Sequence, residues 1–455
     1  MKFIFLLLLS FLFFTIVSAQ PHKGWQNLFN GKNLSGWKAV GGDAKFSIEN
    51  GAIVGTTAMN TRNTFLVTEK EYSDFVLELD ILVEDTAGNS GVQTRSHFDP
   101  GGNEGTGKVY GRQCEVDPSS RKWTGGIYDE GRREWLYPLS LNSKSQDAYK
   151  PGVYNHYRIE CIKNEMKTWV NGKSCAYVAD TLDEKGFIGL QVHAISNPAH
   201  AGKKVFFKNI RIKTGEIKPS TFPRGIFVVN FVPNTLTSYE KSNGWRLLFD
   251  GKSNAGWISA KSNLFPAMGW NISNGNISVL PSEGKEASNG GDIVTREEFS
   301  AFDLSFEFRL TPGANSGVKY FVTLKEITPG SAIGLEYQVL DDSLHPDAKL
   351  GRNGNRTLAS LYDLIPAVKP KRFIRPVGDW NFARLVVYPG NKVEHYLNGI
   401  KVLEYVRGSK EFKDLVAISK YVVWPEFGLA PQGHILLQDH GNAVSFRSIK
   451  IRSLQ

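Results

Sequence analysis

The sequence carries the same series of motifs twice. The nine-residue segments 24–32 and 244–252 both begin with Gly-Trp and end with Phe-Asn/Asp-Gly-Lys, and a second Gly-Trp follows each. The order continues in both halves through Asn-Ser-Gly-Val, Tyr-Asp, Asn-Gly and Gln-x-His motifs, while the offset grows from 220 to 247 residues. A unit of roughly 200 residues is much longer than a solenoid repeat. The sequence therefore predicts two homologous domains, at 22–215 and 243–455, joined by a linker at 216–242 whose apolar run packs on one of them.

Polar and apolar residues alternate with a period of two in both halves. Phe75–Ile81 and Phe302–Leu310 are the clearest examples, and this period is typical of a half-buried β-strand. Asn171-Gly172 and Asn398-Gly399 lie between strand-like runs and have the strongest signal for a hairpin turn. No segment shows the pattern of a long helix. The chain is predicted to be all-β, with two antiparallel sandwiches or jelly rolls in tandem.

Composition and charge argue against several classes of protein. With 41% hydrophobic and 22% charged residues, the chain has the composition of a globular protein. The formal net charge is +9, but Lys and Arg are scattered along the sequence, which favours a solvated surface over a nucleic-acid-binding face. The sequence also lacks the Walker A pattern of phosphate-binding loops and the G-x-S-x-G motif of serine hydrolases. We therefore expect no nucleic-acid partner.

The first 19 residues have the pattern of a secretory signal peptide. Lys2 is followed by an apolar run over 3–17 and by the small residues Ser18 and Ala19. We expect cleavage after Ala19, export to the periplasm or the medium, and membrane contact only through this peptide. Cys114 is expected to be a small core residue, and the absence of C-x-x-C spacing argues against a cysteine metal site.

The motifs of the second half resemble those of a known family. The Phe-Asp-Gly-Lys start, the Asn-Ser-Gly-Val motif at 315–318, the segment 334–342 and the Gln-Asp-His-Gly motif at 438–441 are similar to the 3-keto-disaccharide hydrolase family, long catalogued as a domain of unknown function. The resemblance covers nearly all of both halves. It implies concanavalin-like jelly rolls and an enzyme that cleaves 3-keto-glycosides. It also implies a carbohydrate substrate and a partner sugar 3-oxidoreductase that supplies the keto group.

Strand alternation places several polar residues of the second half on one face. If Leu335 and Tyr337 point to the core, Glu336 and Gln338 share the opposite face. The activity implied by the resemblance requires a base for the proton at C2, a stabiliser for the enolate oxygen and an acid for the leaving oxygen. The catalytic candidates are Glu336 or His440 as base, with Lys319 and Arg356 as oxyanion stabilisers. The candidates for binding the sugar are Gln338, Asp341, Asp342, His345, Tyr362 and Asp363; the last five would bind its hydroxyls or orient the other groups.

The first half has a related but altered set of polar residues. Gln113 and Glu115 alternate on one predicted strand, with Glu and Gln exchanged relative to the second half. The first half also lacks a clear counterpart of the loop 345–356. We therefore expect the second half to be the catalytic one, while the sequence leaves open whether both act. The substrate-binding candidates of the first half are Arg95, Gln113, Glu115, Asp117, Tyr128, Asp129 and His193.

Two other functions stay open at this point. A lectin-like carbohydrate-binding protein would use the same grooves without chemistry, and an ordinary glycosidase would cleave unoxidised glycosides. The titratable candidates Glu336, Asp342 and His440 favour the enzyme acting on keto sugars. No cofactor is expected. The pair Asp341-Asp342 leaves Ca²⁺ as an alternative, although the sequence has no regular calcium loop.

Overall fold

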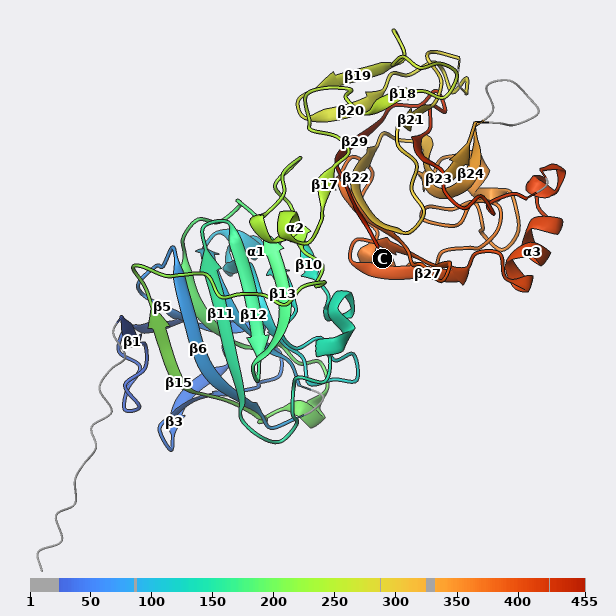
Figure 1. The fold of residues 1–455 in the computed structure, drawn as a ribbon. Helices are drawn as coiled ribbons and strands as arrows, with labels where there is room; N and C mark the ends of the chain where they lie inside the picture. The colour runs from blue at the N-terminus through green and yellow to red at the C-terminus, as the bar shows by residue number, and fades with distance from the viewer. Residues whose placement is uncertain (1–23, 86–87, 287, 325–331, 425, 455) are drawn as a thin grey trace, which may run out of the picture.

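The computed structural model describes residues 24–454, apart from 86–87, 287, 325–331 and 425 (Figure 1). The expected signal peptide at 1–19 lies outside the described residues. Within the described part, the first domain holds β1 to β15 and the second holds β17 to β29, and no helix is long and apolar enough to cross a bilayer. The described α-helices are short: α1 (Gly102–Gly105), α2 (Ser238–Ser242) and α3 (Lys410–Ala417). Separate 3-10 turns lie at Leu139–Ser145, Pro198–His200, Pro346–Lys349, Lys371–Phe373 and Lys420–Val423.

The first domain is a sandwich of two sheets, counted over the described residues. The larger sheet has nine strands, in the order β16 (Val229–Asn230), β13 (Lys173–Ala179), β12 (Glu165–Val170), β11 (Asn155–Ile162), β6 (Phe75–Val83), β15 (Lys204–Lys213), β4 (Ala52–Thr56) and β3 (Lys45–Glu49), with β1 (Trp25–Asn27) beside β15. The smaller sheet has seven, in the order β10 (Glu134–Tyr137), β9 (Ile127–Glu130), β8 (Lys108–Val116), β7 (Ser90–Asp99), β14 (Phe187–Val192), β5 (Thr64–Thr68) and β2 (Trp37–Gly41).

The second domain repeats this architecture. Counted over its described residues, its larger sheet has eight strands, in the order β19 (Trp270–Ser273), β20 (Asn276–Val279), β29 (Val444–Ser453), β22 (Phe302–Leu310), β25 (Asn381–Val387), β26 (Lys392–Leu397) and β27 (Ile400–Val406), with β17 (Arg246–Leu247) beside β29. The smaller sheet has five, in the order β18 (Trp257–Ser259), β21 (Ile293–Thr295), β28 (His434–Leu437), β23 (Asn315–Thr323) and β24 (Ile333–Leu340). The prediction of two tandem all-β, concanavalin-like jelly rolls is confirmed.

The two domains share the order of most of their strands, although β9, β10 and β16 have no counterpart among the described residues of the second domain. The pair Lys319↔Glu336 between β23 and β24 occupies the position of the pair Gln93↔Gln113 between β7 and β8. The main difference follows the last of these strands. The first domain continues into the β9–β10 hairpin, whereas the second continues into the irregular segment 341–380, which rejoins the sheet through an isolated bridge to Leu361.

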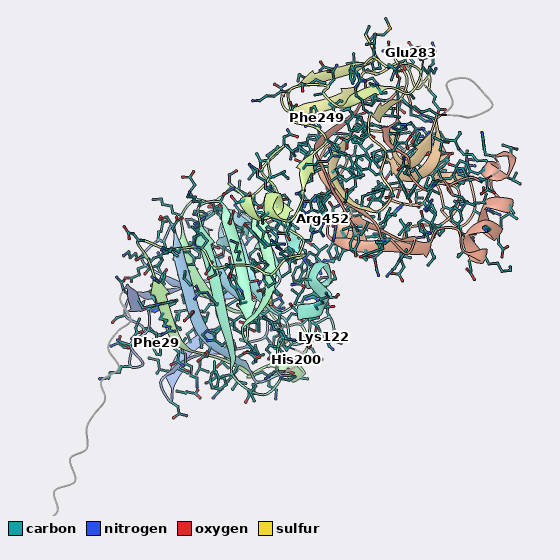
Figure 2. All side chains as sticks on the ribbon, in the orientation of Figure 1. Phe29, Lys122, His200, Phe249, Glu283 and Arg452 are labelled. Carbon is teal, nitrogen blue, oxygen red and sulfur yellow. The ribbon has the colours of Figure 1, made fainter. Side chains whose placement is uncertain are left out.

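Strand alternation builds the core of each sandwich. Leu335, Tyr337 and Val339 of β24 lie fully buried between the two sheets, so Glu336 and Gln338 take the outer face of the smaller sheet, as predicted. Side chains fill the space between the sheets of both domains (Figure 2), and the labelled Phe29 and Phe249 of the repeated motif are both buried. The repeated motif therefore serves the fold and not the site.

The predicted turns and the repeated tryptophan also have structural roles. Asn171-Gly172 and Asn398-Gly399 close the hairpins β12–β13 and β26–β27 with positive φ at both residues of each pair, as a type I′ turn requires. Trp37 donates its indole N–H to the carbonyl of Leu28 at 2.8 Å, and the equivalent bond in the second domain measures 2.7 Å. All three cysteines are buried and unpaired, and Cys114 belongs to the core as expected.

The segment between the domains is packed against both of them. β16 pairs in parallel with β13 of the first domain, which agrees with the expectation that the apolar run 226–232 packs on one domain. Phe227 also lies 5.7 Å from the ring of Phe382, and the Arg384 guanidinium sits 4.1 Å above it. A buried ion pair joins Glu240 of α2 to Lys450 of β29. Aromatic packing and buried charge thus tie the linker to the second domain.

Candidate functional site

A pocket of about 190 Å³ opens on the outer face of the smaller sheet in the second domain. Five of the predicted residues line it: Lys319, Glu336, Gln338, Tyr362 and His440. They come from β23, β24 and the segments that follow β24 and β28, so the strand register brings together side chains that are far apart in the sequence. The lining also includes residues that the sequence reasoning did not propose as site residues: Glu286, Asn315, Lys420, Tyr421, Trp424 and Gln438.

Glu336 is the central acidic group of this pocket. Its side chain is only 5% exposed, and it lies directly across the strands from Lys319. Within the described part of the chain, no protein group donates a hydrogen bond to its carboxylate. Burial raises the pKa of Glu336, while the ammonium groups of Lys319 and Lys420 pull it down. A carboxylate in this setting is a stronger base than one in water.

Two lysines supply positive charge to the pocket. Burial alone would lower the pKa of Lys319, but Asp292, whose Oδ2 lies 3.9 Å from Nζ, and Glu336 outweigh it and raise the pKa. Lys420 behaves differently, because desolvation lowers its pKa and Glu336 only partly compensates. Its Nζ lies 4.3 Å above the ring of Tyr362. The pocket therefore holds one firmly protonated cation on the sheet and a second one on the rim.

Several polar atoms around Glu336 lack a partner in the protein. The amide oxygens of Gln338 and Gln438 and Nδ1 of His440 are buried and make no hydrogen bond within the described part of the chain. Buried polar atoms are normally satisfied, so unsatisfied ones in a pocket mark positions for ligand groups. The His440 ring also packs edge to face against His345 at 5.7 Å.

The structure places Arg356 and Asp363 outside the pocket lining. Arg356 donates to Asp347 at 2.9 Å and to Asp363 at 2.7 Å, and Asp363 also accepts from the backbone N–H of Lys420 at 2.9 Å. Asp347 in turn accepts from the hydroxyl of Tyr362 at 2.8 Å. The expectation that Arg356 stabilises an oxyanion is corrected, because its guanidinium is committed to this network, which positions Tyr362 and Lys420.

Asp341, Asp342 and His345 also have structural partners. Asp341 accepts from the backbone N–H groups of Gly313 and Ser343, and Asp342 accepts from Leu358 N–H and from Lys369. The expectation that these carboxylates face a sugar is corrected, because backbone N–H groups hold the oxygens of Asp341, and Leu358 N–H and the Lys369 ammonium hold those of Asp342. Among the described residues, no group of three or more acidic, His or Cys side chains gathers in a way that could hold a metal ion. His345 caps the 3-10 turn at Pro346–Lys349 through Nδ1.

The first domain has its own pocket, of about 350 Å³, on the corresponding face. Among the predicted residues, Gln113, Glu115, Asp117, Tyr128 and His193 line it. The remaining polar and aromatic side chains of the lining were not predicted as its site residues: Asn63, Asn89, Ser119, Arg121, Glu130, Trp135, Gln191 and, from the second domain, Arg372.

A directed chain of hydrogen bonds runs through the first pocket. Gln93 donates its amide to Gln113 at 2.7 Å, and Gln113 donates to Glu115 at 3.0 Å. Asn89 donates to the other oxygen of Glu115 at 2.6 Å. Burial nevertheless raises the pKa of Glu115 to about 7. By register, Gln93 and Gln113 take the positions of Lys319 and Glu336, so the first domain has amides where the second has a charged pair.

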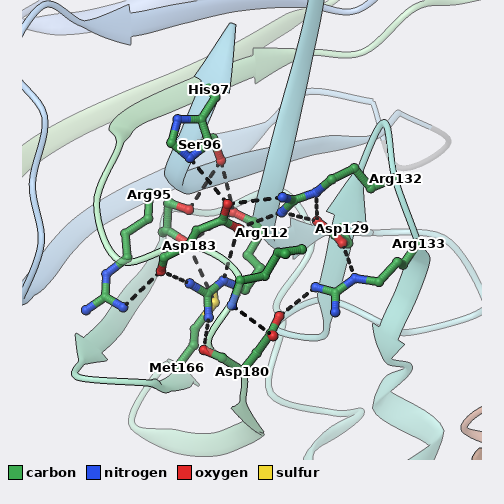
Figure 3. Close-up of polar contacts among 12 residues, drawn as sticks. Arg95, Ser96, His97, Arg112, Asp129, Arg132, Arg133, Met166, Asp180 and Asp183 are labelled. Carbon is green, nitrogen blue, oxygen red and sulfur yellow. Dashed lines mark hydrogen bonds and ion pairs between the residues drawn. The ribbon is translucent and has the colours of Figure 1, made fainter. Parts of the chain in front are cut away.

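Arg95 and Asp129 do not line this pocket but belong to a group of polar contacts around Asp183 (Figure 3). Arg95 donates to the carbonyls of Ser73 and Lys163 and to the carboxylate of Asp74. Asp129 is paired with Arg132 and Arg133. The expectation that Arg95 and Asp129 line the groove is corrected. A bulge in β7 between residues 94 and 97, with Arg95 at φ 48°, breaks the alternation on which the prediction relied.

Comparison with known proteins agrees with the internal repeat. The family described as 3-keto-alpha-glucoside-1,2-lyase-like domain matches residues 24–213 and again 244–452. The chain belongs to this family. It is 38% identical over 234 residues to the 3-keto-disaccharide hydrolase of Bacteroides thetaiotaomicron, a match that covers 47% of this chain and 79% of the relative.

Solved structures of similar proteins are also known. A protein of Parabacteroides distasonis, described as a candidate glycosyl hydrolase, is 28% identical and matches over 49% of this chain and 100% of its own, with a TM-score of 0.42. A second one from the same species is 27% identical over 47% of this chain and 100% of its own, with a TM-score of 0.36. On its family membership, this protein is a carbohydrate-active protein of the 3-keto-disaccharide hydrolase type.

Proposed function

We propose that the second domain cleaves 3-keto-glycosides by proton abstraction at C2, elimination at C1 and hydration. Family membership and the name of the Bacteroides relative support the substrate class. The observation that carries the mechanism is Glu336, a buried carboxylate without a hydrogen-bond donor, opposite Lys319 at the floor of a pocket. A base beside a cation is what an enolate-forming reaction requires.

The residues divide the steps of the reaction between them. Glu336 removes the proton at C2, and the C–H electrons move into the C2–C3 bond as the C3 carbonyl becomes an enolate oxygen. Lys319, kept protonated by Asp292 and Glu336, stabilises that oxygen. The enolate then re-forms the ketone and expels the oxygen on C1, which takes a proton from His440. Water adds across the resulting C1–C2 double bond and completes the hydrolysis.

The amide side chains fit the rest of the sugar. The unpartnered oxygens of Gln338 and Gln438 accept hydrogen bonds from hydroxyls. Tyr421 and Trp424 bring aromatic surface to the lining, which suits the C–H faces of a pyranose. A lectin-like function would use the same contacts, but it would not need Lys319 and Glu336 as a buried pair.

Turnover of a 3-keto-glucoside, followed by NMR beside the unoxidised glucoside, tests this function. Full-length protein is expected to cleave only the keto compound, and Glu336→Gln is expected to lower the rate by about 10³-fold or more, within the range of general-base catalysis. Glu297→Gln is the matched control, because that side chain lies on the surface, paired with Arg246. Cleavage of the unoxidised glucoside, or full activity of Glu336→Gln, would contradict the mechanism.

Export and substrate supply complete the proposal. The segment 1–19 directs the chain out of the cytoplasm. A sugar 3-oxidoreductase provides the keto substrate that the exported enzyme cleaves. N-terminal sequencing of the protein recovered from outside the cytoplasm should begin at Gln20. A mature chain that begins at Met1 would contradict the export step without affecting the catalytic assignment.

A further inference from the structure

The first-domain pocket contains buried polar groups that have no partner. Gln191 is fully buried, and neither its amide oxygen nor its amide nitrogen makes a hydrogen bond to any described residue. The indole N–H of Trp135, a residue only 5% exposed, has no partner among these residues either. Both residues line the pocket. An unsatisfied buried amide is costly, so its retention beside a cavity points to a ligand that both donates and accepts hydrogen bonds.

The arginines of this pocket are already paired with carboxylates, and its other acidic groups accept from neutral amides. Arg121 is bonded to Asp117 at 2.8 Å, and Glu130 accepts from Asn63 at 3.1 Å. Arg372 is paired with Glu134 at 3.2 Å. Because the cations are paired with carboxylates, the pocket offers no excess positive charge for an anion. Amides, an indole N–H and a phenol are the complement of a neutral polyhydroxylated ligand.

The aromatic side chains make one wall of the pocket. Trp135 packs edge to face with Trp123 at 4.7 Å and with Tyr128 at 5.3 Å, and the guanidinium of Arg121 lies 5.2 Å from the Trp135 ring. Aromatic surface next to polar side chains suits a pyranose, which has apolar C–H faces and a polar rim.

The second domain closes part of the same pocket. Arg372 lines it from the 3-10 turn at Lys371–Phe373, and Phe373 packs against Trp123 at 6.2 Å. The pocket is therefore complete only when both domains are present. A vestigial active site of the first domain would not need a residue from the second.

We propose that the first-domain pocket is a second carbohydrate-binding site, which holds an unoxidised sugar unit without acting on it. The Gln93–Gln113 pair lacks the base and the cation that the keto-sugar reaction requires, and the hydrogen-bond chain to Glu115 fixes both amides. The carbohydrate class of the ligand rests on the proposed function. The binding itself rests on the residues of this pocket and is measured without turnover.

Calorimetric titration of full-length Glu336→Gln protein with methyl α-D-glucopyranoside, and with its galacto and manno analogues, tests the proposal. At least one of these glycosides is expected to bind saturably. On the same background, Trp135→Phe removes only the indole N–H, and Arg372→Ala changes an exposed side chain, so neither should prevent folding. Each is expected to weaken binding about five- to tenfold, as the loss of one hydrogen bond or polar contact does. Gln438→Ala is the matched change in the second-domain pocket and is expected to leave this binding unchanged.

Three results would overturn the proposal. The first is the absence of saturable binding for all three glycosides. The second is binding that survives Trp135→Phe and Arg372→Ala but disappears with Gln438→Ala, because the sugar would then sit in the second domain. The third is turnover of a 3-keto-glucoside that persists in Glu336→Gln and is lost when Glu115→Gln is added, because the first pocket would then be catalytic. Failure of wild-type turnover alone would contradict the proposed function and leave this binding result standing.

Discussion

The two domains share a scaffold and differ in the charge at one cross-strand position. Lys319 and Glu336 face each other in the second domain, and Gln93 and Gln113 face each other in the first. An amide pair satisfies itself through a hydrogen bond of 2.7 Å, but it cannot take up a proton at neutral pH. The comparison teaches that two substitutions on adjacent strands exchange a charged pair for an amide pair at the pocket of the same scaffold.

On the inner face of the same sheet, the first domain has the charged residues and the second domain has the neutral ones. Arg95 and Arg112 of the first domain correspond by register to Phe321 and Leu335, which lie in the apolar core of the second. The first domain thus uses ion pairs, with Asp183 between Arg112 and Arg132 (Figure 3), where the second uses hydrophobic packing. At these matched positions the first domain has arginines on the inner face and an amide pair at the pocket, whereas the second has apolar residues on the inner face and a charged pair at the pocket.

Converting the second pocket to the first should have the largest effect. The double substitution Lys319→Gln/Glu336→Gln reproduces the amide pair and removes both base and cation. Turnover of a 3-keto-glucoside is expected to fall by about 10³- to 10⁴-fold. Kinetics by NMR would measure it, with Glu297→Gln as the control. Retention of a tenth of the activity would place the chemistry outside this pair.

Breaking the ion-pair network of the first domain should cost stability. Asp183→Ala leaves Arg112 and Arg132 without their shared carboxylate, and an unpaired buried charge costs about 3 to 5 kcal/mol. Urea unfolding followed by circular dichroism would measure the loss. Asp147→Ala, which removes an exposed pair with Lys173, should change stability by less than about 0.5 kcal/mol. Equal effects of the two changes would mean that the network is not structurally important.

Stability should depend on pH through Glu115, which has no titrating counterpart in the second domain. Its pKa of about 7 in the folded chain lies above the ordinary value of 4.5, so the folded state binds the proton more tightly. The stabilisation is complete below pH 4.5 and is lost as pH rises through 7. Between pH 5 and pH 8, wild-type protein is expected to lose up to about 3 kcal/mol more than Glu115→Gln. Parallel unfolding curves of the two proteins at both pH values would contradict the shift.

The smallest expected effect concerns the rim cation, Lys420. Lys420→Met removes a positive charge that lowers the pKa of Glu336, so that pKa should rise. The acidic limb of the kcat/KM profile should move to higher pH, with about a tenfold loss of activity on that limb. Lys413→Met on exposed α3 is the control. A profile that loses amplitude at every pH without moving would assign Lys420 to substrate binding alone.

Much of the fold and part of the site could be predicted from local sequence patterns. Period-two alternation placed Tyr337 in the core and Glu336 on the outer face, and the Asn-Gly pairs marked two hairpins. The equivalence of Gln93 and Lys319 could also be predicted, because each directly follows an Asn-Ser-Gly-Val motif. Extending the repeat by one residue beyond that motif would have revealed the exchanged pair.

Other site residues left no such signal in the sequence. Lys420 and Tyr421 reach the pocket from a segment more than 80 residues after Glu336 that has no strand periodicity. Arg95 was misplaced because a bulge reverses the face of one residue, and bulges have no reliable sequence signature. Asp341 and Asp342 looked like sugar ligands because they follow a site strand. In the folded chain Asp341 accepts from the backbone N–H groups of Gly313 and Ser343, and Asp342 accepts from Leu358 N–H and from the ammonium of Lys369.

The sequence by itself determined the duplication, the all-β class and the face on which each strand residue lies. These properties depend on side-chain period and turn chemistry, which act between neighbours along the chain. Only the tertiary structure decided which loops close each pocket, that Arg372 of the second domain completes the pocket of the first, and that Arg356 serves a network beside the site. Those outcomes depend on long-range packing and on competition for hydrogen-bond partners, because a side chain's role is set by the groups that the folded chain brings to it.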